Sequence, residues 1–383
     1  TVKYVSSLAA GEMNSDSLQV SPFLTFPQVC GCTDPAYVEY SQLYACGNQD
    51  SCHRLVVFGC MDTTACNFDP MANFNIPSLC CYPGFCNDRN LAVVCPELNN
   101  GRSVLNGIST GAPIGFIIQN EDQKSDDYDH LKDVYRPGHA DYTWQEKFGI
   151  RDHRGGGRSS ARETACRVVA GAIAKSVLNR MNIRVNAYVS SVHKVMVPVT
   201  YDKLNLEIVY DSVVRCPHEE TAMRMEAAIR QAKEEKDSLG GIITCVASGV
   251  PAGWGEPVFD KLHAQLGHAM LSINAVKAFE IGDGFSSTLR KGSENNDSFQ
   301  TNHDGGIQGG ISNGKDIVCK VAFKPTSTIG KKQIALNVNQ QEVELEASGR
   351  HDPCVLPRAV AIVEAMAAIT LLDAALLSRG NKV

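Results

Sequence analysis

The sequence predicts an α+β protein. Long apolar helices and Val-rich strands follow one another after residue 96, and their spacing does not repeat as regular β-α-β units. A chain of 383 residues that is 43% apolar and 20% charged can bury one large core or two smaller ones. Disorder is therefore not the expectation for the chain as a whole.

Helices are predicted where apolar residues recur at helical spacing, over 160–181, 217–238, 257–273 and 357–378. Ser160 opens the first, and Glu163 three residues later predicts a capping box. Alternation predicts a strand over 185–197, and a short apolar run predicts a buried strand over 241–250. Glycine-rich turns at 155–157, 282–284 and 305–314 separate these elements.

We expect a soluble protein. The first thirty residues lack a basic start followed by an apolar run, so no secretory signal is visible. The most apolar stretch, 360–377, is interrupted by Glu364 and Asp373 and is typical of a buried or amphipathic helix rather than a membrane span. The net charge is −6 and there is no basic tail, which argues against nucleic acid as the main partner.

Ten of the fifteen cysteines lie before residue 97, and residues 30–96 form a cysteine-rich segment after a polar lead-in over 1–29. A weak 28-residue repeat joins GCTDPAYVEY, from Gly31, to GCMDTTACNFDP, from Gly59. The second copy resembles short repeats of extracellular bacterial proteins. Dense cysteines predict a disulfide framework in an oxidising compartment, whereas the five scattered later ones predict reduced thiols. Asp62 and Asp69 suit calcium or simply make turns, and we assign no metal site.

The segment RPGHADYTWQEKFGIRDHRGGGRSSARET, from Arg136 to Thr164, gathers five arginines, two histidines and three consecutive glycines just before a predicted helix. Glycines let a backbone approach a ligand closely, and helix amides and arginine forks attract anions. A polyanionic small molecule is the predicted ligand. The alternative from these residues alone is a solvated basic loop with a flexible glycine hinge.

This segment resembles chorismate synthase almost letter for letter. The resemblance starts upstream at STGAPIGFIIQNEDQKSDDYDHLKDVY, from Ser109, and continues in ASGVPAGWGEPVFDKLHAQLGHAMLSINAVKAFEIGDGF, from Ala247. It extends through NHDGGIQGGISNGKDI, from Asn302, FKPTSTI, from Phe323, and GRHDPCVLPRAVAIVEAMAAI, from Gly349. About 104–375 is covered, so 100–383 is the expected catalytic domain.

The resemblance implies a β-α-β sandwich protomer in a cytoplasmic homotetramer that uses reduced FMN, with NADPH as a source of the reduction. It implies a 1,4-anti elimination of phosphate from 5-enolpyruvylshikimate 3-phosphate, which gives chorismate for aromatic amino-acid biosynthesis. Cofactor contacts carry over onto Arg158, Ser159, Ser160, Asn274, Ala275, Gly309, Lys324, Pro325, Thr326, Ser327, Thr328 and Arg350.

Two residues carry over as catalytic. The resemblance implies that His139 keeps the reduced flavin protonated, since histidine titrates near neutrality, and that Asp352 assists removal of the substrate proton. Arg162 and Arg350 carry over as clamps for the substrate's anionic groups. From the residues alone, a histidine after Pro-Gly is more often a turn-capping or surface histidine, and Asp352 would cap the turn before Pro353.

The amino end departs from the family pattern. Chorismate synthases begin with a Gly-Glu-Ser-His-Gly segment and an Arg-Arg-Pro-Gly stretch, and residues 1–96 contain neither. Either a cysteine-rich module has replaced that end, or two unrelated coding sequences have been joined. The conflict in redox compartment favours the joining.

Alternatives to an enzyme are a flavin-binding or substrate-binding pseudoenzyme, or a secreted module with a passenger domain. If the ten cysteines before residue 97 are paired in disulfides, secretion is favoured. If they are free thiols, the cytosol is favoured.

We therefore expect the chain as it stands to show little or no lyase activity. The missing histidine is the family's acid for the departing phosphate, and losing a general acid costs about two to four orders of magnitude. Replacing residues 1–103 with a family-type amino end should restore turnover, measured as chorismate formation. Turnover of the unaltered chain at about 1–1000 per second would contradict this, and His53 would become the first candidate for the acid.

Overall fold

The computed structural model describes residues 118, 128–154, 159–346 and 352–381 with their side chains, and the backbone of several short elements before residue 128. The chain divides into two compact units, 1–119 and 120–383. In the first unit, three pairs of two-residue strands are described. They are β1 (Cys30–Gly31) with β2 (Cys46–Gly47), β3 (Phe58–Gly59) with β4 (Phe74–Asn75), and β5 (Val104–Leu105) with β6 (Ile108–Ser109). The predicted disulfide framework and glycine turn 155–157 lie outside the described residues.

A five-stranded antiparallel sheet forms the centre of the second unit, in the order β11-β14-β10-β8-β9. Its strands are β8 (Arg184–Val192), β9 (Val195–Met196), β10 (Gly241–Ser248), β11 (Val276–Ile281) and β14 (Ile317–Phe323). The middle strands are buried along most of their length because helices cover them. β8 and β9 are joined by a tight turn, whereas the connections from β9 to β10 and from β10 to β11 are long and carry α3 and α4.

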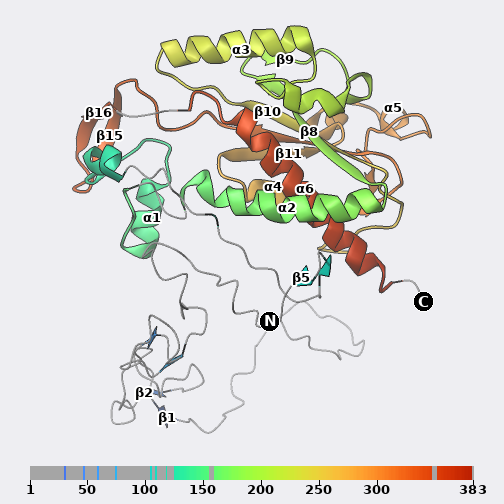
Figure 1. Ribbon diagram of the computed structural model, residues 1–383, viewed down its shortest axis with the longest axis horizontal. Coiled ribbons are helices and arrows are strands. Elements are labelled where there is room, and N and C mark those ends of the chain that lie inside the picture. Colours follow the sequence, from blue (N-terminus) through green and yellow to red (C-terminus); the bar gives the residue numbers. More distant parts are fainter. Residues whose placement is uncertain are drawn as a thin grey trace, which may run out of the picture. The chain divides into compact units, whose positions relative to one another are not determined.

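Helices α2 (Thr164–Arg180), α4 (Leu262–Leu271) and α6 (Leu356–Ser378) form a layer against the sheet, and α3 (Glu219–Glu234) lies on the opposite side (Figure 1). α6 packs on β8 and β10 as well as on both neighbouring helices. One continuous core joins these helices to the sheet. Four of the five described cysteines are buried and all five are free thiols, as expected for the later part of the chain.

α6 is the single described helix that is long and apolar enough to cross a membrane, but half of its most apolar window is buried inside the protein. Its one fully buried charge, Glu364, is satisfied there. The carboxylate accepts from Lys175 Nζ at 2.6 Å, from the Ala187 amide at 2.9 Å and from the Tyr210 hydroxyl at 3.0 Å. Such pairing is what a buried carboxylate needs, so α6 is a core helix.

A second, smaller sheet has three strands in the order β16-β15-β7. It comprises β7 (Val134–Tyr135), β15 (Gln333–Asn337) and β16 (Glu342–Leu345), with the short helix η4 (Ser125–Leu131) and α1 (Asp141–Phe148) attached. Leu131, Ala335 and Leu345 form its own core. The remaining elements are the hairpin β12 (Ile307–Gln308) and β13 (Ile311–Ser312), α5 (Gly292–Asn295), and the 3-10 turns η6 (Ala161–Glu163), η7 (Tyr201–Lys203), η8 (Leu206–Asp211) and η9 (Gly284–Leu289).

The α+β prediction is confirmed, with three local corrections. The predicted capping box does not form: Ser160 Oγ accepts from the Arg162 amide, and Glu163 pairs with Arg167 one turn along instead. The predicted strand 185–197 is a hairpin, because His193 turns the chain with a positive φ of 50°. The third helix begins at Leu262 rather than at 257, because residues 257–259 form a bend and the Leu262 amide donates to the Gly310 carbonyl.

Helices α2 and α6 approach each other closely at Gly171. A Cβ added at Gly171 would lie 2.2 Å from Ala365 Cβ and 2.4 Å from its Cα, so only glycine fits there. Ala365 is itself small and 2% exposed. The two small residues therefore set how near the two longest helices lie.

Gly171→Ala should destabilise the protein by about 1–3 kcal/mol, because the added methyl forces two packed backbones apart. That cost outweighs the gain of roughly 1 kcal/mol in helix propensity. Urea denaturation measures it. The control is Gly292→Ala in α5, where an added Cβ meets nothing within 4 Å, and which should change stability by less than about 0.5 kcal/mol. Equal midpoints for both variants would refute the assignment.

Candidate functional site

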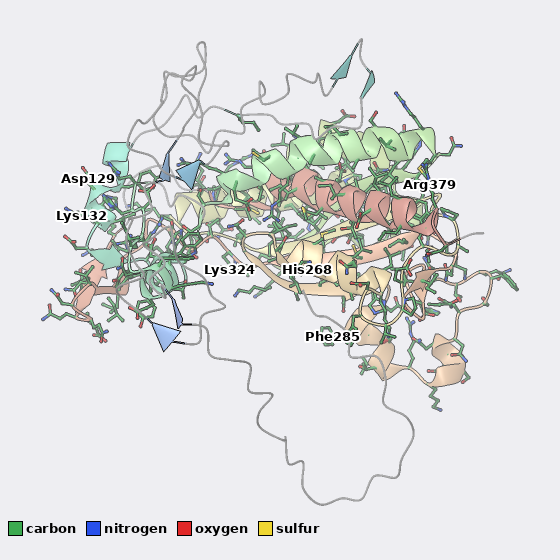
Figure 2. The ribbon with its side chains drawn as sticks, turned by 90° about the horizontal axis from the view of Figure 1, so that it is seen from below. Asp129, Lys132, His268, Phe285, Lys324 and Arg379 are labelled. Carbon is green, nitrogen blue, oxygen red and sulfur yellow. The ribbon has the colours of Figure 1, made fainter. Side chains whose placement is uncertain are left out.

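Five segments distant in sequence line one cleft of about 690 Å³ in the second unit. They are the turn at 136–140, the start of α2 at 159–168, the α4–β11 connection at 273–275, residues 323–328 after β14, and the start of α6 at 352–362. The volume is that of a site for a small organic ligand. Figure 2 labels Lys324, which lies between the part of the unit that carries Asp129 and Lys132 and the larger helical layer.

The turn that carries His139 is built by Pro137 and Gly138. The His139 amide donates to the Arg136 carbonyl at 3.2 Å, and Gly138 has a φ of 67°. Proline before a left-handed glycine is the arrangement of a type II turn. Arg-Pro-Gly-His therefore folds locally, and it presents the histidine at the cleft wall.

Residues 324–328 hold this turn from the other side. Ser327 Oγ donates to the Gly138 carbonyl at 2.7 Å, and Lys324 Nζ donates to the same carbonyl and to Ser327 Oγ. Arg136 Nη1 donates to Thr328 Oγ1 at 3.2 Å. The hydroxyls and the ammonium thus gather around one end of the cleft, where they suit an anionic group.

The Asn274–Ala275 pair lies on the connection after α4. The Lys324 amide donates to the Ala275 carbonyl at 3.0 Å, and Ala275 adopts a left-handed φ of 69° that a non-glycine residue rarely takes. Asn274 Nδ2 donates to the Ser159 carbonyl at 3.3 Å. Its Oδ1 is buried without a hydrogen-bond partner among the described residues, so the amide oxygen is free to accept from a ligand.

The two helix starts bring charged groups to the cleft. Arg162 and Ser160 precede α2, and Asp352 and Arg358 flank the start of α6. Asp352 Oδ2 pairs with Arg358 Nη1 at 3.2 Å, and its Oδ1 accepts from the Cys354 amide at 3.3 Å. The second bond is the turn-capping arrangement, so the carboxylate both caps the turn and faces the cleft.

Arg136 forms the most buried ion pair of the cleft, with Asp141. Arg136 Nε and Nη2 bind the two carboxylate oxygens at 2.8 and 2.9 Å. Burial alone would raise the pKa of Asp141, but hydrogen bonds from Arg136 and His139 outweigh it and hold that pKa well below its usual range. The Asp141 carboxyl is therefore ionised at neutral pH.

Two further groups near the cleft are shifted. Burial, with the nearby charge of Lys277, lowers the pKa of Lys324. Burial raises the pKa of the Cys354 thiol to about 11. That thiol is therefore protonated at neutral pH and is a poor nucleophile.

Most predicted site residues that the structure describes line this one cleft: His139, Ser159, Ser160, Arg162, Asn274, Ala275, Lys324, Pro325, Thr326, Ser327, Thr328 and Asp352. Gly309 does not, since it lies in the turn between β12 and β13. Arg158 and Arg350 lie outside the described residues. Tyr128, Arg136 and Arg358 also line the cleft and were not predicted from the sequence. Arg136 lies in the segment 136–164, but its place in the cleft follows only from its hydrogen bonds to Asp141 and Thr328.

The chorismate synthase family model matches residues 97–376 of this chain. The chain belongs to the chorismate synthase family. The chorismate synthase of Christiangramia forsetii is 57% identical over 286 residues, which are 73% of this chain and 80% of that protein. Those of Parabacteroides distasonis and Bacteroides thetaiotaomicron are 56% and 55% identical, over 72% and 73% of this chain and 80% and 81% of their own lengths.

A crystal structure of a chorismate synthase matches the fold with a TM-score of 0.52 and 32% identity, over 62% of this chain and 70% of that one. All five segments that line the cleft lie inside the matched range 97–376. The cleft therefore belongs to the chorismate synthase part of the chain, and residues 1–96 lie outside the match.

Proposed function

We propose that this chain is a flavin-dependent chorismate synthase whose cleft binds reduced FMN and 5-enolpyruvylshikimate 3-phosphate. The observation that carries the proposal is the convergence of hydroxyls, cations, a histidine and an aspartate from five segments on one cleft, in a chain of this family. Cytoplasmic location, a homotetramer and reduction by NADPH belong to the same proposal and rest on the family resemblance.

The residues present fit FMN. Lys324, Ser327 and Thr328 offer charge and hydroxyls for a phosphate, and Val168, Ile273 and Phe323 provide an apolar wall for a ring system. Asn274 Oδ1 adds a buried acceptor that lacks a protein donor among the described residues, as a ligand N–H would require. Reduced FMN, when bound, supplies electron density to the breaking C–O bond and recovers it afterwards.

The chain's own groups then handle protons and charge. His139 would hold or return a proton at the bound flavin, a role that the two ring nitrogens of histidine allow. Asp352 accepts the proton that leaves the substrate carbon, once substrate displaces the exposed Arg358 guanidinium from it. Arg162, Arg350 and Arg158 would clamp anionic groups of substrate and cofactor.

Lys324→Met should weaken FMN binding about ten- to a hundredfold, because a hydrogen bond to a charged group contributes roughly 1.5–3 kcal/mol. An anaerobic titration under reduction, with substrate present, follows the flavin absorbance. The control is Lys332→Met, a lysine paired with Glu344 on the exposed surface, which should keep the wild-type affinity. No absorbance change for the wild type at high micromolar concentration would remove the flavin assignment.

Asp352→Asn should lower turnover by about a hundredfold or more and leave FMN affinity within severalfold, because it deletes a proton acceptor and almost no volume. Turnover is measured in whichever form is active, the chain itself or the chain with a family-type amino end. Asp373→Asn, an exposed position on α6 outside the cleft, should change neither quantity. Parallel loss of FMN binding in Asp352→Asn would make Asp352 structural.

A further inference from the structure

His139 has a buried carboxylate at one ring nitrogen. Nδ1 lies 2.9 Å from Asp141 Oδ1, and the side chains of His139 and Asp141 are 21% and 3% exposed. Asp141 is the first residue of α1, two positions after the histidine. The short turn between them fixes the ring edge against the carboxylate.

Asp141 is built to accept hydrogen bonds. It receives Arg136 Nε at 2.8 Å, Arg136 Nη2 at 2.9 Å and the Arg136 amide at 3.2 Å, and Arg151 Nη1 lies 3.7 Å away. A carboxylate surrounded by two guanidinium groups stays ionised, so it has no proton to donate to the ring. Any hydrogen bond between Asp141 and His139 must use a proton on Nδ1.

Arg136 Nη2 also lies 3.1 Å from His139 Nδ1. If Nδ1 accepted from Arg136, its lone pair would face an ionised oxygen at 2.9 Å, which is repulsive. With the proton on Nδ1, the ring donates to Asp141, and Arg136 donates to the same carboxylate. The second arrangement satisfies all three groups, and it leaves Nε2 as the nitrogen that can exchange a proton.

We propose that Asp141 is a positioning residue that fixes the Nδ1–H tautomer of His139 and so reserves Nε2 for the ligand in the cleft. The identity of that ligand rests on the proposed function, but the tautomer does not. Arg136 takes part by holding Asp141 through its fork, and its bond to Thr328 Oγ1 ties the assembly to the opposite wall.

The chain contains a matched control. His303 Nδ1 lies 2.6 Å from Asp283 Oδ2, and Arg290 also binds Asp283, so a second His-Asp-Arg group exists. Neither His303 nor Asp283 lines the cleft. Substituting one aspartate should therefore alter one histidine and leave the other unchanged.

The test is a two-bond ¹H–¹⁵N correlation spectrum of the full-length, ligand-free chain labelled with ¹⁵N-histidine at about pH 8, above the ordinary histidine pKa of ~6.5. His139→Gln identifies the signals of His139. We expect a pyrrole-type shift for Nδ1 and a pyridine-type shift for Nε2. In Asp141→Asn the amide oxygen accepts from Arg136 and the amide NH₂ donates to Nδ1 of the ring. The ring proton should then lie on Nε2, so the two nitrogen shifts should exchange. Asp283→Asn should leave the His139 signals in place.

Two results overturn the proposal: a wild-type His139 with its proton on Nε2, or an Nδ1–H tautomer that persists in folded Asp141→Asn. If unpaired guanidinium charge unfolds that variant, Asp141→Ala combined with Arg136→Met removes both charges and should show the same exchange. Because no flavin is present, the result is independent of the FMN titration. Failure of FMN binding would refute the proposed function and leave the tautomer assignment standing.

Discussion

The close approach of α2 and α6 at Gly171 and Ala365 is the constraint on which the rest of the second unit depends. Both helices begin at the cleft, so their separation sets the distance between the groups before α2 and those at the start of α6. α6 also packs directly on the central strands. A larger residue at either contact would move the two walls of the site apart, although neither residue touches the cleft.

Against this rigid layer, the chemistry-bearing groups come mainly from connections. The turn at 136–139 and the segment 324–328 are held to each other through the Gly138 carbonyl and through Arg136. The Gly138 carbonyl accepts hydrogen bonds from the side chains of Lys324 and Ser327, and these bonds hold the turn in place. Functional residues on loops that a rigid scaffold supports are the usual arrangement, and here the small sheet containing β7 supplies the second support.

Local patterns predicted the α+β class and the main helices, because helix periodicity and turn chemistry act over a few residues. The features that the sequence did not predict depend on partners far along the chain or, for the capping box, on a competing ion pair one helical turn away. The helix expected from 257 starts later because the Gly310 carbonyl holds Leu262, and Glu163 leaves the capping box for Arg167. Arg136 became visible only through Thr328, 192 residues away. The chorismate synthase resemblance, not periodicity, selected the cofactor residues.

The charges of the cleft divide into compensated and available groups. Asp141 neutralises Arg136, and Asp352 pairs with Arg358. Among the described residues, Lys324 and Arg162 line the cleft without a carboxylate within 4 Å. Two uncompensated cations on different walls suit a ligand set with separate anionic groups better than a single monoanion. In the proposed function Lys324 holds the flavin phosphate and Arg162 an anionic group of the substrate or cofactor, while the buried Arg136–Asp141 ion pair keeps His139 in place.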